Sequence, residues 1–310
     1  MIENVLAALV PIALLIGLGH GLARTGALPP GFWPQAERLC YFVLLPSLFV
    51  HALATADLAG VPVAGMVAVL LAALLVVAAL TLLGQRVLRF DGAAFTSVFQ
   101  GGIRFNNYVG ITAALALYGT PAVGLAAVAN ATIVPTVNVL SILVFSRYGR
   151  ARADLRGVLN RIVLNPLVLS CLIGFGLRGA GIGLPPGLDG ALEALGRAAL
   201  PLGLMCVGAA LDWSALRTGA VPVAAASVVK FVLMPLATAA ACLALGLGGM
   251  AALVAVLFQA LPTASSSYVL ARQLGGDAPL MAGIITFQTV LAMLTLPPTL
   301  ALAAWFFAGD

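Results

Sequence analysis

Charged residues are scarce in this sequence, and long stretches contain none at all. Only 8% of the 310 residues are Asp, Glu, Lys or Arg, whereas 62% are hydrophobic. A helix needs about 20 apolar residues to cross a bilayer, and five uncharged stretches reach that length: Asn4–Ala23, Leu58–Gln85, Phe105–Ser146, Phe231–Ala271 and Ala278–Gly309. This composition excludes an ordinary soluble domain and predicts an all-α polytopic membrane protein.

Motifs for catalysis and metal binding are also lacking. The sequence contains no G-x-S-x-G, H-E-x-x-H or phosphate-loop pattern. The four cysteines have no metal-ligand spacing and are interpreted as small packing residues inside helices: Cys40, Cys171, Cys206 and Cys242. We therefore expect no enzymatic activity, no cofactor and no bound metal. The net charge of +5 is interpreted as a topology signal, with no nucleic-acid partner expected.

The apolar segments predict ten transmembrane helices with short linkers. They cover roughly residues 3–23, 35–55, 59–86, 93–118, 121–147, 159–178, 191–211, 219–246, 249–273 and 279–307. If the N-terminus lies outside, the inside linkers hold eleven arginines and the outside linkers hold only Arg178 and Arg197. Because basic residues accumulate on the cytoplasmic side, both termini are expected outside. All ten acidic residues fall in linkers or near expected helix ends, so no carboxylate is expected in the membrane interior.

The two halves of the chain repeat each other. Four patterns recur in the same order, roughly 155 to 160 residues apart: the Leu-Pro-Pro-Gly turns ending at Gly31 and Gly187, Pro46 and Pro201, Phe99-Gln100 and Phe258-Gln259, and Asn106–Val109 and Ser266–Val269. Five helices per half is an odd number, so the second half enters the membrane in the opposite direction. The sequence therefore predicts a 5+5 inverted repeat, a fold whose substrate site lies between discontinuous helices at the midplane.

The fourth and ninth helices are expected to be these discontinuous helices, because polar and helix-breaking residues gather in both. The fourth carries Gln100, Arg104, Asn106, Asn107 and Gly110, and the ninth carries Gln259, Pro262, Ser265, Ser266 and Ser267. Irregular backbone within a bilayer must line a cavity or be buried in protein. We expect helix breaks at Gly110 and Pro262 and substrate contacts from the remaining eight residues. A proline kink patched by serines is the alternative for the ninth helix.

Two cations lie in the middle of expected helices. Arg104 has a planar guanidinium suited to a carboxylate, and its alternative role is structural pairing with carbonyls at a helix end. Lys230 is the only lysine. It is expected to donate to carbonyls at the helix breaks and so to replace a coupling cation, with substrate contact or proton carriage as alternatives. Asn130, Asn138 and Gln288 either line the cavity or form hydrogen bonds between helices.

Two motifs of the chain resemble the auxin efflux carrier family, in particular its bacterial members. They are IRFNNYVGITAALALYG in the fourth helix and LPTASSSYVLARQLGGD in the ninth, and KFVLMPL in the eighth is similar as well. The resemblance implies the fold of bile-acid sodium symporters, with crossing helices 4 and 9, and a homodimer. It also implies scaffold helices in residues 1–58 and 151–215 and transport-domain helices in residues 59–150 and 216–310.

The resemblance further implies transport of organic anions, which are auxin in plants and dicarboxylates such as malonate or malate in some bacterial members. Plant members have proline at both crossings, whereas Thr112 and Ser267 lie near those positions here. The long central loop of plant members is also missing, and both departures argue against auxin as the substrate.

The combined prediction is a secondary active transporter of a small organic anion, expected to be a carboxylate. It works by alternating access in the cell membrane, expected to be a bacterial inner membrane. The main alternative is a cation/proton antiporter of related fold, which usually needs an intramembrane carboxylate. The sequence shows no set of catalytic residues that a membrane enzyme would need, and no soluble output domain that a sensor would be expected to have.

Overall fold

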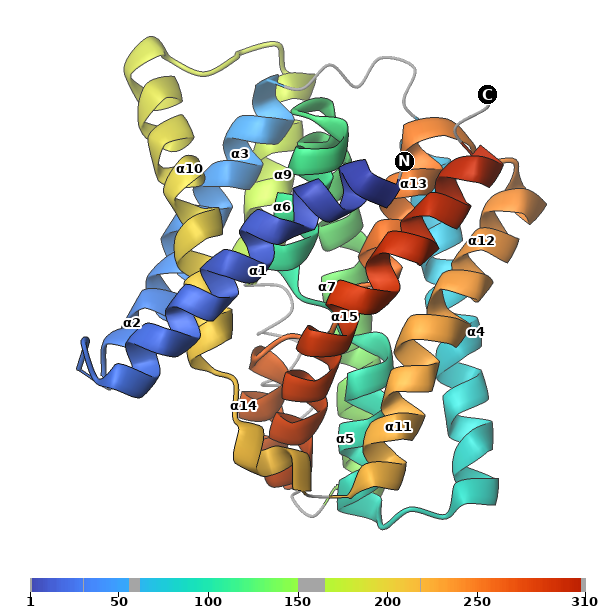
Figure 1. Ribbon diagram of the computed structural model, residues 1–310. Coiled ribbons are helices and arrows are strands. Elements are labelled where there is room, and N and C mark those ends of the chain that lie inside the picture. The colour runs from blue at the N-terminus through green and yellow to red at the C-terminus, as the bar shows by residue number, and fades with distance from the viewer. Residues whose placement is uncertain (1, 30, 56–61, 150–164, 218, 308–310) are drawn as a thin grey trace.

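The computed structural model of the protein describes residues 2–29, 31–55, 62–149, 165–217 and 219–307, and helices dominate all of these ranges (Figure 1). Within them no strand occurs. In the first half of the chain the helices are α1 (Ile2–Thr25), α2 (Phe32–Leu39), the π-helical turn η1 (Cys40–Leu44), α3 (Leu45–Thr55), α4 (Val63–Leu88), α5 (Gly92–Ile103), α6 (Asn107–Tyr118) and α7 (Pro121–Tyr148).

The second half follows the same plan of long helices and one divided helix. Its elements are α9 (Pro166–Gly179), α10 (Pro186–Ala209), the short 3₁₀ helix η2 (Trp213–Arg217), α11 (Ala220–Val228), the π-helical turn η3 (Val229–Leu233), α12 (Met234–Leu245), α13 (Gly249–Gln259), α14 (Ser266–Leu274) and α15 (Ala278–Phe307).

Seven of the expected segments form helices that are long and apolar enough to cross a membrane. They are Val5–Thr25, Phe32–Thr55, Val63–Leu88, Pro121–Tyr148, Pro186–Ala209, Ala220–Leu245 and Ala278–Phe307. Two others are divided into the pairs α5–α6 and α13–α14. The expected start of the segment 159–178, most of the basic linker Arg147–Arg161 and the expected boundary at residues 58 and 59 lie outside the described residues. The prediction of a polytopic helical membrane protein is confirmed.

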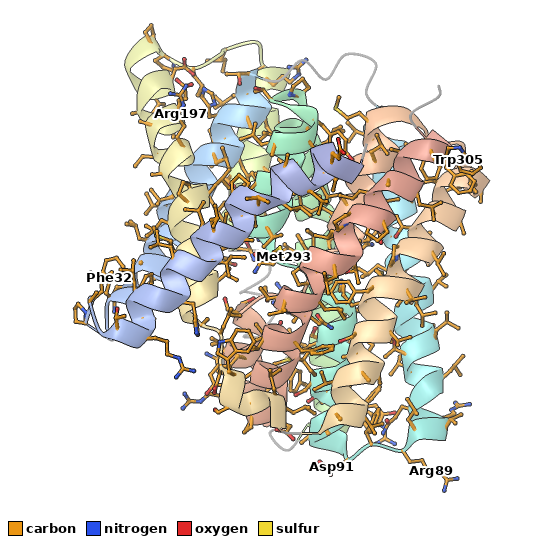
Figure 2. The ribbon with its side chains drawn as sticks, viewed as in Figure 1. Phe32, Arg89, Asp91, Arg197, Met293 and Trp305 are labelled. Carbon is orange, nitrogen blue, oxygen red and sulfur yellow. The ribbon has the colours of Figure 1, made fainter. Side chains whose placement is uncertain are left out.

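The outer surface has the character of a protein surrounded by lipid. Large apolar side chains are exposed on helices all around it, among them Leu14, Leu172, Leu243, Leu294 and Trp305. The charged residues labelled in Figure 2 lie at the ends of the molecule instead, with Arg89 and Asp91 at one end and Arg197 at the opposite end. A bilayer favours this separation because its core accepts apolar side chains and rejects charges.

The helices form two groups. In the first helix group, α1, α2, α3, α9 and α10 pack against one another, and in the second helix group α4–α7 and α11–α15 do so. In Figure 1 the first group occupies the left side and most of the second group the right. α6, α7 and α15 also contact helices of the first group, so the two groups share a long boundary.

Glycines allow very close approaches inside the first group and across the boundary. A Cβ atom at Gly208 of α10 would overlap the carbonyl of Ile16 in α1, and one at Gly203 would overlap the ring of Tyr108 in α6. Apolar helix faces gain little hydrophobic free energy by associating in lipid, so association depends on close packing, which small residues allow. The ring of Tyr108 thereby fits against α10 at the boundary between the groups.

Candidate functional site

The first helix interruption lies at residues 104–106, between α5 and α6. Arg104 has extended backbone, with φ −79° and ψ 161°, and ends α5. Asn106 starts α6, because its side-chain Oδ1 accepts hydrogen bonds from the N–H groups of Tyr108 (3.1 Å) and Val109 (3.3 Å). Asparagine is among the preferred residues for this capping position. The interruption is therefore encoded locally, by residues of the segment itself.

The second interruption lies at residues 260–265, between α13 and α14. It contains Pro262, which has no N–H group to continue a helix. Ser265 precedes α14 but makes no capping hydrogen bond with its side chain. The N–H of Ser267 instead bonds the carbonyl of Ala264 at 3.0 Å.

Gln288 of α15 joins the two interruptions. Its Nε2 donates to the carbonyl of Gly101 near the end of α5 (3.0 Å), and its Oε1 accepts from the N–H of Thr263 in the second interruption (3.1 Å). Gln288 is fully buried. Backbone groups freed by a helix break inside a membrane must find partners in the protein, and this single amide supplies one to each break. Of the two roles left open for Gln288, the structure therefore shows the helix-to-helix hydrogen bond.

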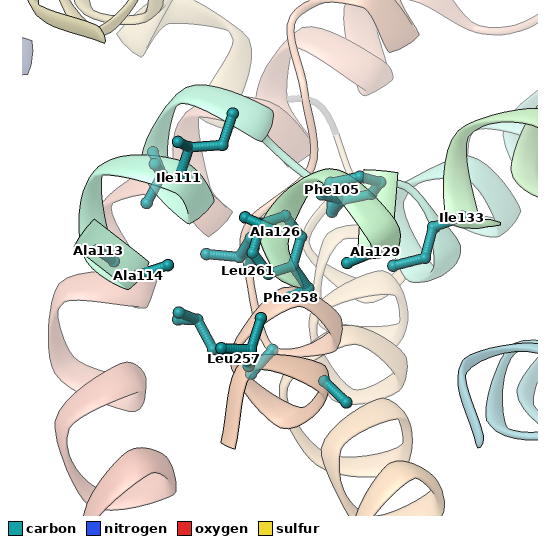
Figure 3. Close-up of a cluster of buried hydrophobic side chains, with 14 of the residues drawn as sticks. Phe105, Ile111, Ala113, Ala114, Ala126, Ala129, Ile133, Leu257, Phe258 and Leu261 are labelled. Atoms are coloured by element: carbon teal, nitrogen blue, oxygen red, sulfur yellow. The ribbon is translucent and has the colours of Figure 1, made fainter. Parts of the chain in front are cut away.

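A cluster of apolar side chains packs around both interruptions (Figure 3). The rings of Phe105 and Phe258 lie 5.7 Å apart in an edge-to-face arrangement. Gly110 faces the same cluster, since a Cβ there would lie 2.5 Å from Leu261 Cδ1 and 3.2 Å from the ring of Phe258. Gly110 lies inside α6, not at a break. The expectation that Gly110 breaks the helix is wrong. The absence of a side chain at this position instead allows α6 to approach Leu261 and Phe258 closely.

A cavity of about 450 Å³ opens beside the N-terminal ends of α6 and α14. Its polar lining includes Glu37, Arg38, Tyr41, Arg104, Asn106, Asn107, Tyr108, Ser265, Ser266 and Gln273. Helix N-termini carry a partial positive charge that attracts anions. Two such ends and two arginine side chains therefore border the same space.

Arg104 also lines a smaller cavity of about 140 Å³, together with Asn107, Ser266 and Asn138. The Arg104 Nη1 donates to Asn138 Oδ1 at 2.9 Å, and Nη2 lies 3.4 Å from Ser266 Oγ. Both partners are neutral. Within the described residues, no carboxylate forms an ion pair with the guanidinium. Asn138, whose role the sequence left open, thus holds the side chain that faces both cavities.

Glu37 is the site residue that the sequence analysis missed. Its Oε1 accepts a hydrogen bond from Ser265 Oγ at 2.6 Å, and its side chain lines the larger cavity with Arg104. The sequence placed Glu37 near a helix end and gave it no function. The available signal was its position in the stretch Phe32–Cys40, where polar residues alternate with apolar ones at the start of a membrane segment.

Three of the expected substrate contacts do not line either cavity. Gln100, Gln259 and Ser267 are fully buried and line neither cavity. Gln259 Nε2 donates to the carbonyl of Leu70 at 3.3 Å, and Ser267 Oγ lies 3.2 Å from Thr263 Oγ1. Of the eight expected contacts, the cavity lining brings together the other five: Arg104, Asn106, Asn107, Ser265 and Ser266.

Lys230 is fully buried in η3 and lines neither cavity. Its neighbour Val229 packs against Gly102, which places η3 beside the end of α5. Its Nζ has no hydrogen-bond partner among the residues that the structure describes. The expected donation from Lys230 to a carbonyl at a helix break is therefore not formed in this part of the chain.

Comparison with known protein families decides the class of this protein. A family model described as membrane transport protein matches residues 149–299. Over these residues, which make up just under half of the chain, the protein is similar to this family. The match confirms the resemblance to auxin efflux carriers, and it covers the second interruption, Lys230 and Gln288. No curated protein sequence matches the chain. Together with the apolar helices, the family identifies a multi-pass membrane transporter.

Proposed function

We propose that this membrane transport family protein is a secondary active transporter of a small organic anion, bound through a carboxylate at Arg104. The observation that carries the proposal is the Arg104 guanidinium, which faces the larger cavity and, among the described residues, has only neutral hydrogen-bond partners, Asn138 and Ser266. A cation that is withdrawn from water needs a compensating anion or dipole. A substrate carboxylate supplies that charge and fits the planar fork of the guanidinium.

The two helix N-termini support the same substrate class. Asn106 and Asn107 start α6, Ser265 and Ser266 start α14, and all four line the cavity with Arg104. These ends favour a negative charge between them. Gln100, Gln259 and Ser267 then support the site from the side away from the cavities. Lys230, beside the end of α5, supplies the positive charge of a coupling cation without a hydrogen bond to either helix break.

The proposed mechanism is alternating access in a ten-helix, 5+5 inverted-repeat fold. The two interruptions at matching places in the two halves support the repeat, with α5–α6 and α13–α14 as the crossing helices. The first helix group corresponds to the scaffold of residues 1–58 and 151–215, and the second to the transport domain of residues 59–150 and 216–310. We propose a homodimer in the cell membrane, with both termini outside.

Uptake into proteoliposomes tests this function. Purified protein is reconstituted, and uptake of radiolabelled malonate, malate and auxin is followed with and without an opposing gradient of the same unlabelled acid. We expect saturable exchange of at least one dicarboxylate, with no catalytic conversion of the acid. If the protein exchanges none of these acids although it is folded and inserted, the proposed substrate class is wrong.

A cation/proton antiporter remains the second candidate, and one observation favours it: Glu37 supplies a carboxylate to the cavity. Such an antiporter would move protons in response to a sodium, lithium or potassium gradient without any organic acid. A pH-sensitive dye inside the same proteoliposomes distinguishes the two functions. We expect no cation-driven proton movement, and a saturable one would favour the antiporter.

A further inference from the structure

Glu37 reaches from one helix group to the other. It belongs to α2, which packs against α10 and η1 in the first group. Its carboxylate accepts a hydrogen bond from the hydroxyl group of Ser265, the residue that precedes α14 in the second group, at 2.6 Å. This hydrogen bond therefore crosses the boundary along which the two groups would move.

The carboxylate of Glu37 occupies a position suited to a substrate anion. Ser265 leaves its own helix uncapped and gives its hydroxyl to Glu37, so the carboxylate lies one hydroxyl group away from the N-terminal end of α14. A helix N-terminus favours a negative charge within its first turn. The protein thus places an anion of its own where the positive end of α14 faces the cavity.

Glu37 and Arg104 are held by consecutive residues. Ser265 bonds Glu37, and Ser266 lies 3.4 Å from Arg104 Nη2, so an anion bound at Arg104 enters the surroundings of the Glu37 carboxylate. Two like charges in one partly desolvated cavity repel each other. A proton on Glu37 removes the repulsion, and the Ser265 hydroxyl serves both states, because a hydroxyl can donate to a carboxylate or accept from a carboxylic acid.

The other titratable and charged groups around Glu37 are arginines, phenols and thiols. Arg38 and Tyr41 on its own segment, Arg104 and Tyr108 share its cavity. Cys40 and, on α10, Cys206 lie within electrostatic range of it. Arginine keeps its charge at all working pH values, and free thiols and phenols of this kind are ordinarily neutral near pH 7. Among these groups, Glu37 is the one with a carboxylate that can take up and release a proton.

We propose that Glu37 carries one proton in each transport cycle, so that the protein is a proton–anion symporter. The inference rests on the proposed anion carrier. A proton from water in the cavity binds a carboxylate oxygen of Glu37, and the anion then binds Arg104. The groups move, the anion leaves on the other side, and the same proton returns to water there, so no other reactant is consumed.

The test compares exchange with accumulation in proteoliposomes held at zero membrane potential, with radiolabelled malonate as the probe. An imposed pH gradient should drive wild-type accumulation of about tenfold per pH unit, because one pH unit and a tenfold concentration ratio each correspond to about 1.4 kcal/mol. Glu37→Gln should lower the ratio of accumulation to exchange to the value of passive equilibration. Glu37→Asp should retain accumulation, and Glu193→Gln, which alters a surface carboxylate paired with Arg197, should match wild type.

Three results would overturn the proposal. The first is accumulation of malonate against its gradient by Glu37→Gln. The second is loss of all exchange by both Glu37 variants while they elute as folded protein, which indicates a substrate contact. A dye measurement on wild type needs no variant: malonate influx without accompanying proton influx also refutes it. Lack of exchange for malonate, malate and auxin contradicts the anion carrier itself, whereas net malonate influx without proton influx contradicts only the role of Glu37.

Discussion

The two helix interruptions obtain their partners in different ways. In the first, Asn106 caps α6 from within the interruption and Arg104 stands beside it. In the second, Ser265 leaves α14 without a side-chain cap and bonds Glu37 of the other helix group instead. The hydrogen bonds that support the interruption at residues 104–106 therefore come from the second helix group itself. The interruption at residues 260–265 also bonds a residue of the first helix group.

This difference separates the contacts that the proposed movement of the groups would preserve from those that it would break. The Asn106 cap and the Gln288 bridge join parts of the second group to each other, so a rigid movement of that group preserves them. The bond between Ser265 and Glu37 joins the two groups, so the proposed movement would break it. The comparison predicts that substitutions at the first kind of contact change stability and those at the second kind change transport.

The largest effect is expected for Gln288→Leu, which removes the support shared by both interruptions. The Gly101 carbonyl and the Thr263 N–H would each lose a partner, and a buried unpaired polar group costs about 1–3 kcal/mol. We expect a loss of about 2–6 kcal/mol of stability, seen as a lower melting temperature in detergent. Thr295→Val is the matched control, because Thr295 on the same helix bonds only its own preceding turn, at Leu291. If Q288L melts like this control, the bridge is not a stabilising element.

Arg104→Gln tests the charged residue of the first interruption. A charge-assisted hydrogen bond contributes about 1.5–3 kcal/mol, so the affinity for the anion should fall on the order of ten- to a hundredfold. Arg104→Lys should restore part of it, because the charge returns without the planar fork. Arg197→Gln at a distant end of the molecule is the control. A folded R104Q protein that binds and transports as well as wild type would make Arg104 a structural residue.

The sequence predicted the interruptions because their causes are local. Polar residues in apolar segments and Pro262 indicate breaks by themselves, and the two matching patterns indicate that Arg104 and the serines share a site. Gly110 was misinterpreted because glycine serves equally as a helix breaker and as a contact surface. Only the neighbours Phe258 and Leu261, far along the chain, distinguish the two roles.

Glu37 could not be assigned from the sequence for a similar reason. Near the start of an expected helix, a glutamate is ordinarily an interfacial residue, and nothing in the sequence states that α2 meets the start of α14. The bond to Ser265 joins residues far apart in the chain. Local patterns predict elements and breaks, but a partner contributed by another helix group depends on how the groups pack.

A smaller effect distinguishes the two N-terminal positions directly. Asn106→Ala removes two capping hydrogen bonds to Tyr108 and Val109 and should cost about 0.5–2 kcal/mol of stability. Ser265→Ala removes no cap and should cost less, while it frees Glu37 and alters transport. Paired melting curves and uptake rates measure both. A larger loss of stability in S265A than in N106A would reverse our interpretation of the two interruptions.

The smallest effect is expected for sodium, which should not be required by either interruption. A sodium site in a helix break needs oxygen ligands, usually including a carboxylate, and neither interrupted segment, 104–106 or 260–265, contains an acidic residue. The carboxylate of Glu37, which lies beside the second interruption, is bonded to Ser265 and shares its cavity with Arg104. Among the described residues no group of three or more His, Cys, Asp or Glu side chains could hold a metal ion. A protonated Lys230, beside the end of α5, would also repel a cation. Uptake of malonate should therefore be unchanged when choline replaces sodium on both sides of the proteoliposome membrane. A saturable sodium requirement would mean that backbone carbonyls at the interruptions bind the ion, and Lys230 would then lose its role as a cation substitute.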